Sequence, residues 1–149
     1  DDMISDWLIT VENVLKEKDL TIETLGYFGL SMGTMFGVPL LASQLEFNAS
    51  VIGLCGSSGA ASMIGERLLK DAEQITHPTT FLMQLEDELF DRNGYLALFD
   101  AIQSDNKKIH ANPGLHPDVP KEEIDYSIEF LVKNLTRKEV VSPLKRIAE

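Results

Sequence analysis

Short segments typical of strands alternate with stretches of helical periodicity along this chain. The predicted strands cover residues 25–30, 50–55, 79–85 and 107–111. Helices are predicted at residues 3–18, 32–45, 60–75, 93–103 and 120–134. The first three strands are almost continuously apolar, as in a sheet that is buried on both faces. The pattern therefore predicts an α/β fold, with a parallel sheet covered by helices on both faces.

Composition limits the protein to a few broad classes. The 149 residues suffice for one domain with a real core. The net charge of −11 disfavours nucleic acid or an anionic membrane as a partner. The chain shows no apolar run of membrane-spanning length and no secretory signal. Its single Cys55 excludes an intrachain disulfide and fits a reducing compartment, so a cytoplasmic location is predicted.

The boundary between the first strand and its helix carries the motif Gly29-Leu30-Ser31-Met32-Gly33. A serine at such a corner, with glycine two positions to each side, is the layout of a nucleophile elbow. The turn strains the serine backbone, and larger residues at Gly29 or Gly33 are expected to clash with the neighbouring strand and helix. Gly33 and Gly37 are also expected to let the helix approach the sheet closely. The alternative is a tight turn without catalysis.

A serine hydroxyl needs a base, and three histidines compete for that role. His77 precedes Pro78 at the amino end of a strand, on the wrong edge of the sheet. His110 lies within the fourth strand, where we expect it to pack against a helix. His116 lies in a loop at the carboxyl edge, where ligands of such sheets bind. His116 is therefore the predicted base, with a surface loop histidine as the alternative.

The base in turn needs an orienting carboxylate, and the loop after the third strand is crowded with acidic residues. Asp87 falls just past the strand and is the predicted acid. Glu86 and Asp91 remain alternatives, although Asp91 is well placed to cap the next helix. The order of serine, acid and histidine along the chain is the one found in hydrolases with this kind of turn.

Other residues near the predicted site have less specific signals. The backbone N–H of Met32 is the expected oxyanion donor. Phe36, Phe90, Leu115 and the loop at 56–59 are candidates for lining a substrate pocket, although aromatic residues at helical spacing belong more often to a core. Cys55 is predicted to be a small buried apolar residue. The sequence has no Cys/His cluster and no glycine-rich phosphate loop, so no metal and no other cofactor is predicted.

These motifs resemble the carboxyl-terminal half of an α/β hydrolase, and most of all the dienelactone-hydrolase-like esterases. The matching segments are the motif at 29–33, the strand and acid loop at 78–87, and Gly114-Leu115-His116. The resemblance covers about residues 25–135 and implies that Ser31 attacks an acyl carbonyl, His116 relays the proton and Asp87 is the acid. Residues 1–135 would then form the carboxyl-terminal part of one domain. Residues 136–149 would be a charged tail, which could form a short docked helix.

The chain departs from that family because the strands that normally precede the elbow strand are absent from it. One loop in that region supplies the second oxyanion donor of the family, so Met32 would provide only one of two. The strand at 25–30 would also lose a neighbour and expose an apolar edge. We therefore expect the missing half to be present in cis or as a second chain, or a homodimer to form through this strand.

The leading hypothesis is a serine hydrolase that cleaves carboxylic esters or related small acyl substrates. An acyltransferase with the same three residues is the near alternative, because the acyl group can pass to another acceptor. A third hypothesis is a non-catalytic interaction module that pairs through the open sheet edge. The sequence does not specify which substrate is used.

Overall fold

The computed structural model describes residues 2–18 and 23–136 of the chain. Its elements, in chain order, are α1 (Asp2–Lys18), β1 (Gly26–Leu30), α2 (Met32–Leu41), β2 (Ala49–Gly53), η1 (Gly59–Ile64), α3 (Gly65–Ala72), β3 (Thr79–Gln84), α4 (Arg92–Ala101), β4 (Lys107–Asn112) and α5 (Lys121–Leu135). Apart from Thr136, the predicted tail lies outside the described residues. No helix in these two ranges is long and apolar enough to span a bilayer.

The four strands form one parallel sheet in the order β1-β2-β3-β4. The two central strands, β2 and β3, are buried along their whole length, as the apolar residues at 51–52 and 81–83 lead one to expect. β1 and β4 lie at the two edges of this sheet. Because all strands run in the same direction, their carboxyl ends meet at one edge, and the loops that follow β1, β3 and β4 come together there.

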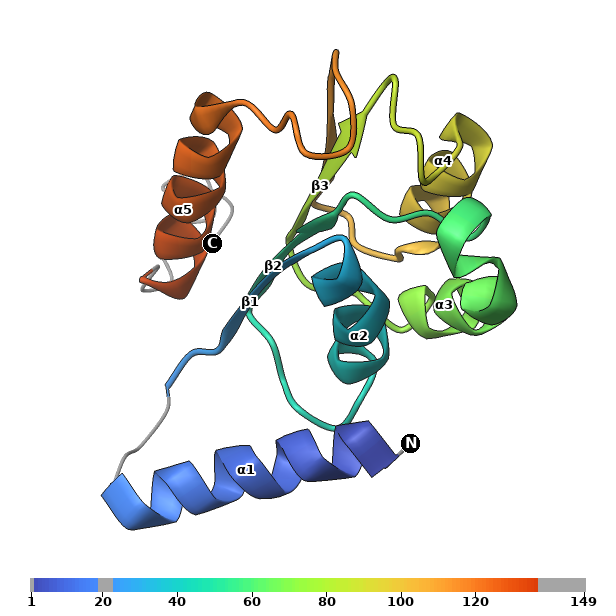
Figure 1. The fold of residues 1–149 in the computed structure, drawn as a ribbon. Coiled ribbons are helices and arrows are strands. Elements are labelled where there is room, and N and C mark those ends of the chain that lie inside the picture. Colours follow the sequence, from blue (N-terminus) through green and yellow to red (C-terminus); the bar gives the residue numbers. More distant parts are fainter. Residues whose placement is uncertain (1, 19–22, 137–149) are drawn as a thin grey trace, which may run out of the picture.

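Helices cover both faces of the sheet (Figure 1). α2, α3 and α4 pack side by side on one face, whereas α5 is the helix of the described residues that packs on the other. α1 contacts α2 and lies near the end of the sheet where the strands begin. The main core, which includes the fully buried Phe81 and Ile52, fills the space between the sheet and the three helices. The predicted α/β fold, with a parallel sheet and helices on both faces, is therefore confirmed.

The predicted boundaries differ from the structure by a few residues, and three of them show why. The helix predicted over 32–45 ends at Leu41, where the N–H of Ser43 donates to the carbonyl of Leu40 three residues back instead of continuing the helical pattern. The second strand ends at Gly53, because Leu54 has a φ of 50° and turns the chain out of the sheet. The helix predicted over 60–75 is divided into η1 and α3 and ends at residue 72.

Candidate active site

Ser31 occupies the corner between β1 and α2 in a strained backbone conformation. Its φ of 55° and ψ of −116° lie in a region that residues with a side chain rarely adopt. The corner is fixed because the N–H of Ser31 donates to the carbonyl of Gly53 at 2.9 Å. The carbonyl of Ser31 accepts from the N–H groups of Thr34 and Met35 in the first turn of α2. These bonds hold the serine at the carboxyl edge of the sheet.

The buried hydroxyl of Thr34 joins this corner to the neighbouring strand. Its Oγ1 lies 2.8 Å from the carbonyl of Gly29 and 2.6 Å from that of Gly53, and it accepts from the N–H of Gly53 at 2.8 Å. One side chain thus ties α2 to the ends of β1 and β2. The sequence analysis missed Thr34, and the available signal was a polar residue within an otherwise apolar helix.

The glycines of the elbow have different roles. A Cβ at Gly29 would lie 2.9 Å from the carbonyl of Gly33, and one at Gly37 would lie 2.4 Å from the ring of Tyr27. Both positions therefore allow a close approach of α2 to β1, as expected. The same expectation is wrong for Gly33, because a Cβ there would meet no atom of the described residues within 4 Å other than its chain neighbours and the backbone of its own helix. Gly33 contributes its carbonyl instead, which accepts from the Tyr27 hydroxyl at 2.6 Å.

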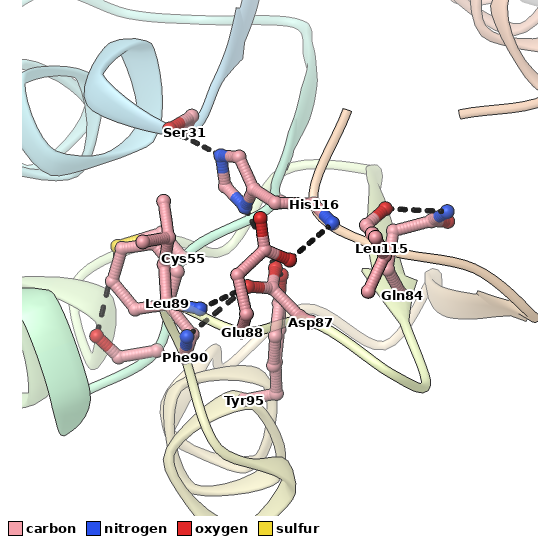
Figure 2. Close-up of polar contacts among 12 residues, drawn as sticks. Ser31, Cys55, Gln84, Asp87, Glu88, Leu89, Phe90, Tyr95, Leu115 and His116 are labelled. Atoms are coloured by element: carbon pink, nitrogen blue, oxygen red, sulfur yellow. Dashed lines mark hydrogen bonds and ion pairs between the residues drawn. The ribbon is translucent and has the colours of Figure 1, made fainter. Parts of the chain in front are cut away.

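The loop after β4 places His116 between Ser31 and Asp87 (Figure 2). Its Nε2 lies 2.8 Å from the Ser31 Oγ, and its Nδ1 lies 2.7 Å from the Asp87 Oδ2. The imidazole is mostly buried, and the Asp87 side chain is fully buried. When Nδ1 carries a proton and donates it to the carboxylate, Nε2 is left free to accept from the serine hydroxyl. The arrangement is therefore suited to removing a proton from Ser31.

Every side of the Asp87 carboxylate meets a hydrogen-bond donor. Its Oδ1 accepts from the backbone N–H groups of Leu89 at 2.8 Å and Phe90 at 3.1 Å. Its Oδ2 accepts from the Tyr95 hydroxyl as well as from His116. Burial alone raises the pKa of Asp87, but these hydrogen bonds outweigh it and hold the pKa below its usual value. Asp87 is therefore an ionised acceptor for the imidazole at neutral pH.

The other carboxylates of this region have structural contacts of their own. Glu86 accepts from the backbone N–H of Gly114, and Glu88 accepts from that of His116 at 2.9 Å. Asp91 caps α4 by accepting a backbone N–H of the first turn, which confirms the predicted cap. Glu86 and Asp91, the alternative acids, thus have other partners. Asp87 is the carboxylate that contacts the imidazole.

Gln84, the last residue of β3, anchors the histidine loop. Its side-chain Nε2 lies 3.4 Å, 3.3 Å and 2.9 Å from the carbonyl oxygens of Pro113, Leu115 and Asp118. The buried amide of Gln84 therefore lies within hydrogen-bond distance of three carbonyl oxygens of the loop that carries His116. The sequence analysis missed this residue as well, although a glutamine at the end of a buried strand was a detectable signal.

The two remaining histidines lie away from Ser31. His110 is in β4, with its Nδ1 2.6 Å from the carboxylate of Glu123 on α5, so it packs against a helix as expected. His77 precedes β3 at the amino end of the sheet, and its Nε2 lies 2.9 Å from the Ser50 Oγ. Burial lowers the pKa of His77 to about 4.

His77 leads to a prediction about acid stability. The folded protein disfavours the protonated imidazole, so stability that is fully present above about pH 6.5 is lost as the pH falls towards 4. The side chain keeps some contact with water, so we expect a loss of about 1–2 kcal/mol in the free energy of unfolding rather than the full linkage value. Urea unfolding of the wild type and of His77→Gln at pH 7 and pH 5 measures this loss in the free energy of unfolding. The variant should show a smaller loss, and equal losses would contradict the assignment.

The candidate pocket residues lie in different surroundings. Met32 is exposed at the first position of α2, where a helix leaves its backbone N–H without an internal acceptor. Phe36 and Leu115 are about half exposed, and Phe36 lines an open apolar groove between α1, α2 and α3. Phe90 is buried, and its ring centroid lies 5.8 Å from that of His116.

Cys55 is buried as predicted. Among the described residues, no His, Cys, Asp or Glu cluster is arranged to hold a metal ion.

Solved structures with the same fold include several hydrolases. A cold-adapted esterase from an Arctic intertidal metagenomic library is 34% identical, with a TM-score of 0.82 over 90% of this chain and 58% of that protein. The Pyrococcus furiosus esterase Pf2001 is 17% identical, with a TM-score of 0.73 over 91% of this chain and 63% of that protein. The Pyrococcus horikoshii acylaminoacyl peptidase is 17% identical, with a TM-score of 0.66 over 98% of this chain and 30% of that protein.

These neighbours are esterases and a peptidase of the α/β-hydrolase type. The described part of the chain has the α/β fold of the matched region of these hydrolases. The chain spans less than two thirds of the length of each of these proteins. No protein-family model and no curated protein sequence matches it.

Proposed function

We propose that this chain carries the catalytic residues of a serine hydrolase that cleaves carboxylic esters or related small acyl substrates. The observation that carries the proposal is the hydrogen-bonded series Ser31–His116–Asp87, with links of 2.8 Å and 2.7 Å. The strained backbone of Ser31 supports it, because strain at such a corner is a feature of nucleophile elbows. The esterase that is 34% identical to this chain supports the same reaction class.

The proposed reaction proceeds through an acyl-enzyme. The Ser31 Oγ attacks the carbonyl carbon of the ester while its proton moves to His116 Nε2, and Asp87 stabilises the resulting imidazolium. The N–H of Met32 donates to the oxygen that gains negative charge. As the tetrahedral intermediate collapses, the C–O bond breaks and the alcohol leaves with the proton from His116. Water then gives a proton to His116 and attacks the acyl carbon. The bond between that carbon and the Ser31 Oγ breaks, His116 returns the proton to the Oγ, and the acid leaves.

The finer substrate assignment rests on the resemblance to dienelactone-hydrolase-like esterases and on the surface around Ser31. We propose that Phe36, Phe90 and Leu115 contribute apolar contacts to the acyl or alcohol group. The net charge of −11 argues against nucleic acid or an anionic membrane as the substrate surface. No cofactor is needed for this reaction, and the single buried Cys55 is compatible with the cytoplasm.

Hydrolysis of p-nitrophenyl esters tests the function, with the chain alone and with an added amino-terminal half from a related esterase. We expect release of p-nitrophenol that follows the protein concentration and increases in the presence of the second half. Adding a competing alcohol or amine separates hydrolysis from acyl transfer, because a transferase would give the new ester or amide. A preparation with the second half bound that releases no p-nitrophenol from any short-chain ester would contradict the proposal.

We further propose that β1 pairs with a strand of another segment, either the missing half in cis, a second chain, or a second copy of this chain. β1 is an edge strand of the described sheet, and Phe28 on it is 42% exposed. The neighbouring esterases extend beyond the matched region, because the chain covers 58% of one and 63% of another. A segment next to β1 would also lie close to Ser31 and could provide the second oxyanion donor.

A charge on this strand tests the pairing. Phe28→Glu is expected to weaken association at β1 by about tenfold or more, because charged residues on edge strands oppose pairing. Leu96→Glu is the matched control, since Leu96 is also 42% exposed but lies on α4. Sedimentation velocity over a concentration series measures the association. A wild-type chain that remains a monodisperse monomer would rule out self-association through β1. Equal effects of the two variants on binding of an added amino-terminal half would rule out the open edge as an interface.

A further inference from the structure

We propose that Tyr95 is a positioning residue for the Ser31–His116–Asp87 site and that it acts through the Asp87 carboxylate. The proposal rests on the hydrolase function proposed above. The Tyr95 hydroxyl donates to the Asp87 Oδ2, which is the oxygen that also accepts from His116 Nδ1. The Tyr95 hydroxyl and His116 therefore share one carboxylate oxygen. Removing one of these two hydrogen bonds strengthens the other.

The position of Tyr95 is fixed by the same loop that carries Asp87. Asp91 at the end of this loop caps α4, and the N–H of Tyr95 donates to the Asp91 carbonyl at 3.1 Å. The Tyr95 ring is fully buried and packs edge-on against Phe81 and Phe90. The hydroxyl therefore has little freedom to leave the carboxylate. Figure 2 shows Tyr95 reaching from α4 towards Asp87, on the side away from Ser31.

The hydroxyl stays a donor over the whole pH range in which the site can work. Burial raises the pKa of Tyr95 well above its ordinary value, and its hydrogen bond to Asp87 and the charge of that residue raise it further. Because Tyr95 donates to Oδ2, it holds the carboxylate in place and takes up part of its negative charge. Less charge then remains to stabilise the imidazolium that forms when His116 accepts the serine proton.

Two effects should follow from removing only the hydroxyl. In Tyr95→Phe the ring contacts remain, but Oδ2 faces His116 alone and attracts the protonated imidazole more strongly. The acidic limb of the pH–rate profile should then move to higher pH by about half a unit, which is roughly a threefold change in rate on that limb. On the plateau the rate should fall about 3- to 10-fold, because the carboxylate is held less firmly.

The experiment measures the second-order rate of labelling by a fluorophosphonate between pH 5 and 9 for the wild type, Tyr95→Phe and Tyr126→Phe. Tyr126 lies on α5, on the opposite face of the sheet, so its variant should match the wild type. The same variants in an Asp87→Asn background complete a double-mutant cycle. The effect of Tyr95→Phe on the acidic limb should disappear there, because the proposed route runs through the carboxylate.

A second measurement follows the ring protons of His116 by NMR against pH, and it needs no turnover or labelling. We expect their midpoint to move upward by about half a pH unit in Tyr95→Phe relative to Tyr126→Phe. An unchanged His116 midpoint would show that Tyr95 is only a packing residue. A loss of labelling rate without a shift of the acidic limb of the pH–rate profile would show the same. A wild type that does not label at Ser31, even though the His116 midpoint moves, would instead contradict the hydrolase function.

Discussion

Ser31→Ala is expected to lower kcat for ester hydrolysis by about 10⁴- to 10⁶-fold, with a change in KM of no more than a fewfold. The variant removes the Oγ that lies 2.8 Å from His116 Nε2, so no acyl-enzyme can form at this position. The residual rate comes from the oxyanion donor and substrate binding alone. Alanine keeps a Cβ at the strained corner, so the free energy of unfolding should change little.

Steady-state kinetics on p-nitrophenyl acetate measure this effect, and urea unfolding verifies that the variant is folded. Ser43→Ala is the matched control, because Ser43 follows α2 and its Oγ accepts from the N–H of Leu45 two residues further along the chain. The control should retain wild-type activity. A Ser31→Ala variant that keeps more than about a tenth of the wild-type kcat would show that another group is the nucleophile.

Asp87→Asn is expected to lower kcat by about 10⁴-fold at neutral pH, for a reason that the structure specifies. The N–H groups of Leu89 and Phe90 both point at Oδ1, so the asparagine carbonyl must remain there. The amide NH₂ then takes the place of Oδ2 and donates to His116 Nδ1. The imidazole is forced to carry its proton on Nε2, facing Ser31, where it cannot accept the serine proton.

Glu88→Gln is the matched control for this variant. The Glu88 carboxylate accepts from the backbone N–H of His116, and a glutamine oxygen can take over that bond. Its kcat should therefore fall less than about fivefold. If the two variants lose activity equally, Asp87 acts only by holding the loop and not by fixing the tautomer of His116.

The fold could be predicted because the information is local. The apolar runs and helical periodicities that define β1, α2 and β3 lie within single segments of sequence. The direction of a parallel sheet then follows from the alternation of these elements. Ser31, Asp87 and His116 could be predicted as site residues for the same reason, since each follows a strand at the same sheet edge. Their roles in catalysis remain predictions.

The contacts that hold the site together could not be predicted, because they depend on register and packing. Thr34 serves the corner only because the end of β2 lies beside it, and Gln84 meets the histidine loop only in the observed pairing of β3 with β4. Tyr95 reaches Asp87 because Asp91 fixes where α4 begins. The error at Gly33 has a similar origin, since the space beside this residue depends on how α2 lies against the sheet.

The most direct test is peptide mapping by mass spectrometry after the wild-type protein reacts with a fluorophosphonate. The account predicts one adduct per chain, on the peptide that contains Ser31, and no adduct after His116→Gln at the same dose. An adduct on another serine, or equal labelling of Ser31 without His116, would contradict the assignment of Ser31 and His116 as nucleophile and base.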